Sequence, residues 1–175
     1  MDFYDIVSET CAFDDGFRER LGFKNIFTVN KDVMAVGAGR GPSADIGVCI
    51  AFGRPQNLLP LVKGGVGSVA ITDSYIDKKL MEAISENGCI LCMPMVSITS
   101  SYGQERVRNI YKMSKLFSHA RKLGIEVSFA SMAKTALYMN SYIQLIALAR
   151  LVGADDGYAR HSISELNRRV GSGMA

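Results

Sequence analysis

The sequence predicts an α/β fold in one domain. Two observations predict it: short runs of apolar residues without polar alternation, and helix-length amphipathic segments between them. Strands that are apolar on both faces belong to parallel sheets covered by helices. A regular alternation of strands and helices is typical of this class. The chain has 175 residues, the size of one ordinary domain.

Six apolar runs have the character of buried strands. Glycine precedes two of them, at Gly88 and Gly124. Because glycine readily adopts the left-handed conformation that ends a helix, both glycines are predicted to terminate helices that feed the next strand. The six runs occupy residues 26–29, 33–36, 46–52, 66–71, 89–96 and 125–131.

Four helices are expected among these runs. They occupy about 74–87, 103–123, 141–152 and 155–169. The second is the longest, and at 100° per residue its apolar side chains share one arc. That arc, the predicted core face, consists of Ile110, Met113, Leu116, Phe117 and Ala120.

The chain contains no linker-like segment, repeat or low-complexity tract, so a single domain is expected over residues 1–170. The tail 171–175 has small residues and no apolar anchor, and we expect it to be disordered. A complete eight-fold β/α barrel needs about 250 residues. A barrel of this length would therefore be a trimmed one, and the pattern alone leaves an open sheet as the alternative.

Positive charge is concentrated in one segment. The whole chain carries a net charge of +3, but residues 104–134 carry +5 and the rest sums to −2. Only Glu105 and Glu126 oppose the basic residues of the segment. Such a concentration is typical of a surface that binds a polyanion. The basic residues are Arg106, Arg108, Lys112, Lys115, Arg121, Lys122 and Lys134.

The long helix places most of this charge opposite its apolar arc. That face carries Arg108, Lys112, Lys115, His119 and Lys122, and no carboxylate. Like charges at i,i+4 repel each other, so a one-sided face favours an external polyanion. The alternative is a solvated helix face. Arg106 and Arg121 flank the apolar arc and are placed to reach a partner protein or phosphate. Lys134 is placed to face phosphate or solvent.

The cysteines indicate buried thiols in a reducing cytoplasm. Cys89 and Cys92 form a C-x-x-C inside an apolar run, whereas a redox motif begins a helix. Cys11 and Cys49 do not supply the second pair of a zinc site. No apolar stretch reaches the ~20 residues that span a membrane, and the acidic N-terminus is unlike a signal peptide. We expect a cytoplasmic protein.

The candidate catalytic groups are sparse. Asp73 and Asp77 follow the run 66–71, where α/β proteins place their sites, and they are candidates for a metal or for helix capping by Asp73 or Ser74. The chain has only two histidines, which cannot build a histidine-rich metal cluster, and it has no G-x-S-x-G nucleophile motif. The residues therefore suggest a basic scaffold without catalytic machinery of its own.

From about residue 44 to 164 the chain resembles the ribonuclease P protein component 3 family, the archaeal relative of the eukaryotic 30-kilodalton subunit. GVGSVAITDS (65–74) is similar to a strand and turn of that family, and 103–133 to its helix and strand core. There, Arg106 or Arg108 with Asn109 matches an R-x-x-N helix start. LIALARLVG (145–153) and ARHSIS (159–164) resemble the two following helices. Residues 140–144 depart from the family pattern and lack its two arginines.

The resemblance implies a trimmed β/α barrel related to phosphoesterases of the polymerase and histidinol phosphatase type, generally without their metal ligands. It implies a non-catalytic subunit that stabilises the catalytic ribonuclease P RNA for 5′ maturation of precursor tRNA. The expected partners are that RNA, precursor tRNA indirectly, and other protein subunits, one small subunit in direct contact. Mg²⁺ serves the RNA, and no cofactor is expected on the chain.

The residues expected to face RNA all lie in the basic segment. They are Arg106, Arg108, Lys112, Lys115, Lys122 and Lys134. Two alternatives stay open. One is a small metal-dependent phosphoesterase on the related fold, using Asp73 and Asp77. The other is a protein-interaction scaffold whose basic face meets an acidic protein.

Overall fold

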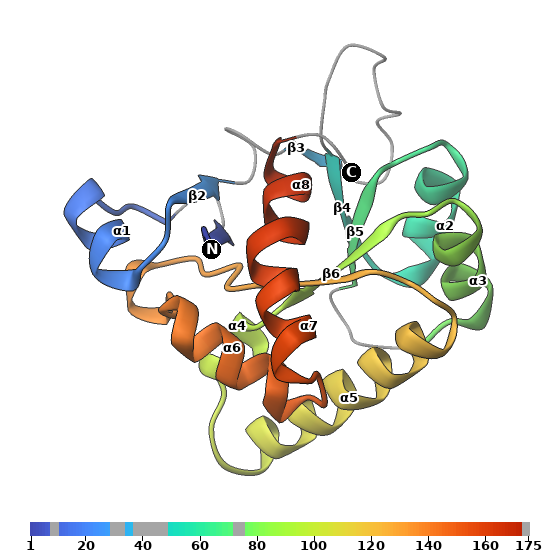
Figure 1. The fold of residues 1–175 in the computed structure, drawn as a ribbon. Helices are drawn as coiled ribbons and strands as arrows, with labels where there is room; N and C mark the ends of the chain where they lie inside the picture. Colours follow the sequence, from blue (N-terminus) through green and yellow to red (C-terminus); the bar gives the residue numbers. More distant parts are fainter. Residues whose placement is uncertain (8–10, 29–33, 37–48, 72–75, 173–175) are drawn as a thin grey trace.

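The computed structural model describes residues 1–7, 11–28, 34–36, 49–71 and 76–172, and it confirms the predicted α/β class (Figure 1). The strands are β1 (Tyr4–Val7), β2 (Asn25–Thr28), β3 (Met34–Val36), β4 (Cys49–Gly53), β5 (Ser68–Ile71), β6 (Ile90–Pro94) and β7 (Val127–Ala130). The helices are α1 (Asp15–Leu21), α2 (Pro55–Lys63), α3 (Lys78–Glu86), α4 (Val96–Thr99), α5 (Gly103–Lys122), α6 (Tyr142–Leu151), α7 (Asp156–His161) and α8 (Asn167–Ser172). A 3₁₀ turn, η1 (Ala136–Tyr138), precedes α6, and a π-helical turn, η2 (Ser162–Leu166), joins α7 to α8.

Every described strand pair is parallel. β3 to β7 form one ladder in sequence order, and β1 pairs with β2. β1 also lies beside β7, where the amide of Met132 donates to the carbonyl of Ile6 at 2.8 Å. The strands thus run in the order β2-β1-β7-β6-β5-β4-β3, the arrangement of a TIM-like barrel wall. The trimmed-barrel prediction agrees with this order.

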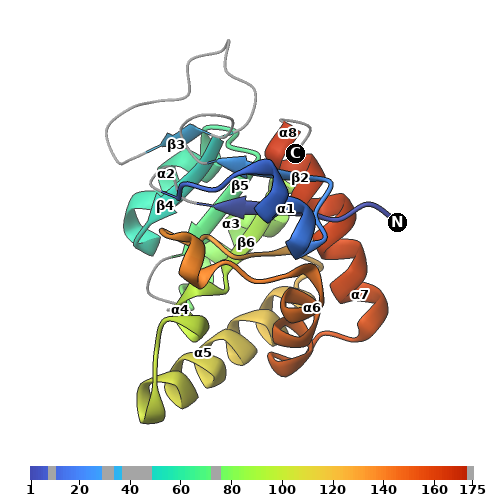
Figure 2. The ribbon, with the colours of Figure 1, turned by 90° about the vertical axis from the view of Figure 1, so that its left-hand side faces the viewer.

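The two faces of the strands are covered differently. One face, with Val69, Leu91 and Phe129, packs under the helices that connect the strands. The opposite face packs against the C-terminal helical segment through Leu166 and Val170. Figure 2 shows α2 and the α7–α8 segment on opposite sides of the strands.

Several elements differ from the sequence predictions. β1, α1 and α2 were not predicted, and the predicted strand 89–96 ends at Pro94, after which α4 begins. α8 continues to Ser172, two residues into the expected tail, and the other three lie outside the described residues. Positions 29, 33, 46–48 and 74–75 of the predicted elements also lie outside the described residues. The helix-ending glycines are confirmed, since Gly88 has φ 62° and Gly124 has φ 72°.

Side chains of the C-terminal segment complete the hydrogen bonding of β7. The Tyr158 hydroxyl accepts from the amide of Val127 at 2.6 Å, and the Ser162 hydroxyl from the amide of Phe129 at 2.8 Å. The Asn167 amide donates to the carbonyls of Phe129 and Tyr4, each at 2.8 Å. Buried backbone groups need partners. The C-terminal segment therefore provides hydrogen-bond partners for backbone groups of β7 and β1, as a longer pairing between these two strands would.

Asp5 joins the same two strands from within β1. It is fully buried, and its Oδ1 accepts from the amides of Ile6 at 2.8 Å and Ser131 at 2.7 Å. Its Oδ2 has no hydrogen-bond partner among the described residues. Burial raises the pKa of this carboxyl to about 6, although the bonds from Ser131 and Ile6 oppose the shift.

This pKa makes stability depend on pH. Because the folded-state pKa lies above the ordinary value of 3.8, protonation favours the folded state, and the contribution is lost as pH rises from about 4 to about 6. We expect Asp5→Asn to remove this slope and to raise the free energy of unfolding at pH 7 by about 1–3 kcal/mol. Urea unfolding of both proteins at pH 4 and pH 7 measures it. A wild-type stability that rises between these pH values, together with a destabilised variant at pH 7, would contradict it.

Candidate nucleic-acid interface

α5 is held against the strands by its predicted core face. Met113, Leu116, Phe117 and Ala120 are all buried, and Ile110 packs partly buried beside them. The Phe117 ring lies 5.4 Å from that of Phe129 in β7, centroid to centroid. The predicted apolar arc is confirmed, and it leaves the other side of the helix toward solvent.

Neighbouring helices fix α5 from both sides. The Ser85 hydroxyl of α3 donates to the carbonyl of Leu123 at 2.7 Å. The Ser114 hydroxyl of α5 donates to the carbonyl of Val152, next to α6, at 2.8 Å. A helix anchored along its back and both flanks presents its outer side chains at fixed positions, which favours repeated contacts with an extended ligand.

The outer face of α5 carries four exposed cations, Arg108, Lys112, Lys115 and Lys122. Within the described ranges, no carboxylate forms a salt bridge with any of them. From Arg108 to Lys122 the helix rises about 21 Å. We call these four residues the basic face. The sequence predicted all four, and the structure brings them together on one side of one helix.

The other two predicted RNA-facing residues lie apart from the basic face. Arg106 is half-buried, its Nε donates to the carbonyl of Ser101 at 2.7 Å, and its guanidinium lies 5.3 Å from the Tyr102 ring centroid. Lys134 is exposed beyond the carboxyl end of β7, outside α5. Arg121, the other flanking arginine, lies over the Tyr158 ring at 4.3 Å. The arginines flanking the core face thus stack on aromatic rings of the protein itself.

The acidic residues of the basic segment do little to neutralise this face. Glu126 pairs instead with Arg169 of α8, at 2.7 Å. Glu105 lies in the first turn of α5, where a carboxylate interacts favourably with the helix dipole. It is three residues before Arg108 and so lies at the amino end of the basic face. With four cations and this one carboxylate, the basic face keeps a net positive charge.

Asp77 has the role of a helix cap. It is the N-cap of α3, and its carboxylate accepts from the amide of Leu80 at 2.9 Å. Asp73, the other candidate metal ligand, and Ser74, a candidate cap, lie outside the described residues. Across the described part of the chain, no group of three or more His, Cys, Asp or Glu side chains is placed to hold a metal.

The capping role of Asp77 makes a prediction. We expect Asp77→Ala to lower the free energy of unfolding by about 1 kcal/mol, because the first turn of α3 loses its cap, and Asp77→Ser to recover most of the loss. Thermal unfolding of the three proteins in EDTA measures it. A serine variant as unstable as the alanine variant would contradict capping. Destabilisation seen only when Mn²⁺ or Zn²⁺ is present would favour the metal alternative.

The thiols of the C-x-x-C are buried, as predicted. The Cys89 thiol donates to the carbonyl of Val66 at 2.9 Å, and Cys92 is completely buried. Burial raises the pKa of Cys92 to about 12. Because only the thiolate is reactive, this environment suppresses nucleophilic and redox chemistry at Cys92.

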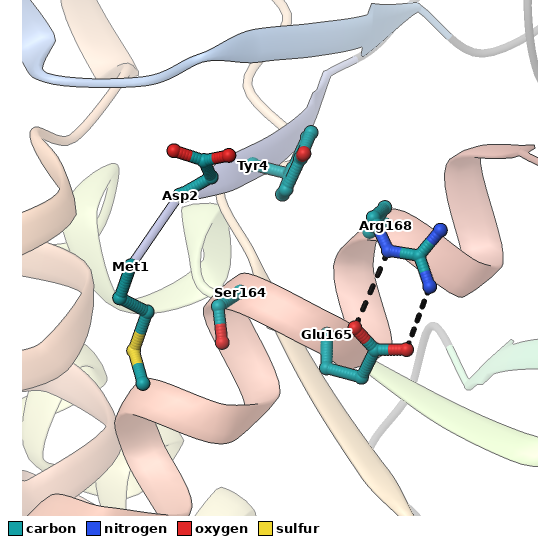
Figure 3. Close-up of a pocket in the computed structure, with 6 residues that line it drawn as sticks. All are labelled: Met1, Asp2, Tyr4, Ser164, Glu165 and Arg168. Carbon is teal, nitrogen blue, oxygen red and sulfur yellow. Dashed lines mark hydrogen bonds and ion pairs between the residues drawn. The ribbon is translucent and has the colours of Figure 1, made fainter.

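A shallow hollow of about 260 Å³ lies at the amino end of β1, beside the C-terminal segment (Figure 3). It is lined by Met1, Asp2, Tyr4, Ser164, Glu165 and Arg168. Glu165 and Arg168 bind each other there, at 2.8 Å. The hollow lies away from the carboxyl ends of the strands, where barrel proteins place catalytic groups. It is not part of the basic face.

Sequence reasoning missed two residues of the outer face. Val107 and Tyr111 have 66% and 63% of their surface exposed, respectively, and both lie on α5 beside the basic face. The signal was available on the helical wheel, because both residues fall outside the apolar arc. Their presence makes the face partly apolar as well as basic.

No family model matches the chain, and no curated protein sequence matches it. Solved structures do match in fold. A chain in a cryo-EM structure of archaeal ribonuclease P with mature tRNA superposes with a TM-score of 0.67 at 14% identity. That match covers 97% of this chain and 80% of the other. At this identity the likeness establishes the fold.

Hydrolases share the same fold. A. niger ochratoxinase matches with a TM-score of 0.60 at 11% identity, over 98% of this chain and 71% of that one. A Xaa-Pro dipeptidase with bound methionine matches with a TM-score of 0.56 at 13% identity, over 81% of this chain. The chain spans 44% of the length of that dipeptidase. The fold is therefore that of TIM-like barrels, in enzymes and in a ribonuclease P chain alike. No helix in the described ranges is both long and apolar enough to cross a bilayer.

Proposed function

We propose that this chain is a non-catalytic protein subunit of a ribonuclease P and that the basic face of α5 contacts RNA. The observation that carries the proposal is that face: Arg108, Lys112, Lys115 and Lys122 lie on one side of one helix without carboxylate partners among the described residues. Fold alone does not separate a ribonuclease P subunit from a hydrolase of the same architecture. The four cations without carboxylate partners among the described residues favour a ribonuclease P subunit.

The physical role of such a face is to neutralise phosphate charge. Folding a catalytic RNA around precursor tRNA brings phosphates close together, and lysine and arginine side chains release the counterions that would otherwise be confined there. Contacts of this kind position the RNA without reading its sequence. Helix α5 is suited to this role because its core face and both flanks are anchored. In this proposal the RNA performs the cleavage with Mg²⁺, and a small protein subunit binds elsewhere on the chain.

The test is to purify the tagged chain from its native cells at low salt and to sequence the RNA that accompanies it. The eluate is then assayed for Mg²⁺-dependent 5′ cleavage of precursor tRNA. We expect one abundant structured RNA, with cleavage abolished by ribonuclease pretreatment. A preparation without RNA contradicts the proposal. Bound metal with phosphoester hydrolysis lost on Asp73→Ala would support the phosphoesterase instead, and a partner retained after ribonuclease treatment would support an acidic protein.

A further inference from the structure

Tyr111 lies along one edge of the basic face. It lies three residues after Arg108, one before Lys112 and four before Lys115, and residues three and four apart are neighbours on a helix surface. Val107 lies one turn earlier, also mostly exposed. The ring is therefore an accessible aromatic surface with an apolar neighbour, and Arg108 and Lys115 lie next to it on the helix surface.

The ring already binds a cation in this structure. The ammonium of Lys115 lies 5.4 Å from the Tyr111 centroid. An aromatic face attracts cations through its quadrupole, but the interaction is weak at exposed sites. A ligand that offers both a flat π-surface and a phosphate can replace it at little cost, since the base stacks on the ring while the lysine turns to the phosphate.

We infer that Tyr111, flanked by Val107, is a stacking site for an unpaired RNA base whose adjoining phosphates bind Arg108, Lys112 and Lys115. This inference rests on the proposed function and narrows the ligand from RNA in general to a single-stranded stretch of it. Stacking on aromatic side chains is how proteins bind unpaired nucleotides with little sequence preference. A continuous duplex hides its base faces, so it can use the cations but not the ring.

Tyr102 supplies a matched control. It is 71% exposed and also has a cation over its ring, the guanidinium of Arg106 at 5.3 Å. It precedes the first turn of α5, however, and Arg106 leans to the core side of the helix, away from the basic face. Tyr102→Ala thus removes a similarly exposed tyrosine, the N-cap residue of α5, without touching the inferred site.

The experiment uses the full chain and two RNA probes of equal length at low salt: a single strand carrying one 2-aminopurine, and a continuous duplex. Affinity is measured by fluorescence anisotropy with end-labelled RNA, and stacking by quenching of the 2-aminopurine. We expect Tyr111→Ala to lose single-strand affinity by about five-fold or more and to lose the quenching, while duplex affinity is unchanged. Tyr111→Phe keeps both signals, and Tyr102→Ala behaves as wild type.

The outcomes separate the two proposals. Tyr111→Ala that binds and quenches like wild type overturns the stacking site, and salt-sensitive duplex binding in the same samples would leave the RNA-binding face standing. An equal loss with Tyr102→Ala also overturns it, because the effect would then belong to any exposed tyrosine in or next to α5. If the wild-type chain binds neither probe at low salt, both the stacking site and the basic face as an RNA contact fail.

Discussion

Asn167→Ala is expected to lower the free energy of unfolding by about 3 kcal/mol or more. Asn167 is completely buried, its amide donates to the carbonyls of Tyr4 and Phe129, and its Oδ1 accepts from the Ser128 hydroxyl. Alanine would remove the Asn167 bonds of the buried Phe129 carbonyl and the part-buried Tyr4 carbonyl, and would leave the Ser128 hydroxyl only a long contact of 4.0 Å to Cys92 Sγ. Each unsatisfied buried group costs about 1–3 kcal/mol. The small cavity left behind adds to the loss.

Ser164→Ala is the matched control. Its hydroxyl lies in the same helical segment but donates only to local carbonyls, at 2.8 Å to that of Arg160, on the exposed side. We expect this change to alter stability by less than about 0.5 kcal/mol. Asn167→Asp keeps the shape but replaces the donor with oxygen facing two carbonyls, so it should be as harmful as alanine. Urea unfolding compares the four proteins, and an Asn167→Ala effect no larger than that of Ser164→Ala would contradict the bridging role.

The π-helical turn explains how one segment makes all these bonds. Tyr158 and Ser162 are four residues apart and share a helix face, but Asn167 follows Ser162 by five. In a regular α-helix five residues rotate the side chain about 140° away from the first. The wider turn of η2 reduces this mismatch and lets both Ser162 and Asn167 reach β7. The π-helical turn thus allows one helical segment to hydrogen-bond to both β7 and β1.

Much of this fold could be predicted from the sequence because most strands are apolar on both faces. β5 and β6 are buried along nearly their whole length, and their runs contain no polar alternation. β1 was not predicted because Asp5 interrupts a four-residue run, and the burial of Asp5 depends on the amide of Ser131, 126 residues away and just beyond β7. α2 was not predicted because Pro60 lies inside it, although Pro55 in its first turn is a helix-start signal.

The candidate site was predictable to the extent that it depends on one helix. The 100° periodicity of α5 separates Leu116 and Phe117 from Arg108 and Lys115 without reference to the rest of the molecule. The position of the Arg106 side chain was not predictable, because its hydrogen bond to the carbonyl of Ser101 depends on the turn before the helix. The pairing of Glu126 with Arg169 was equally hidden, since it needs the path of the C-terminal segment. Helix faces follow from local spacing, whereas side-chain partners follow from tertiary structure.

Reversing two charges on the basic face is expected to weaken RNA binding more than any single change there. In Arg108→Glu with Lys112→Glu, two cations one turn apart become carboxylates. Each phosphate contact adds about 0.7–0.9 to the slope of log affinity against log salt, so losing two should reduce the slope by about 1.4–1.8. Repulsion between the new carboxylates and phosphates adds to the loss, and we expect affinity near 0.1 M salt to fall by more than about ten-fold.

Lys78→Glu with Lys79→Glu provides the matched control for net charge. Both lysines are exposed in the first turn of α3, where glutamate suits the helix dipole. Lys78 loses an ion pair with Glu82, at 3.7 Å, but exposed pairs of this kind contribute less than about 1 kcal/mol, so the protein should stay folded. The charge change equals that of the α5 variant, but it lies on another helix. Salt titrations of RNA binding should show a reduced slope for the α5 variant alone. Equal losses in both variants would mean that the whole-molecule charge attracts RNA, and an unchanged slope in the α5 variant would remove α5 from the RNA contact. A loss confined to α5 would place the phosphates along that helix, because only a local contact distinguishes two variants of identical charge.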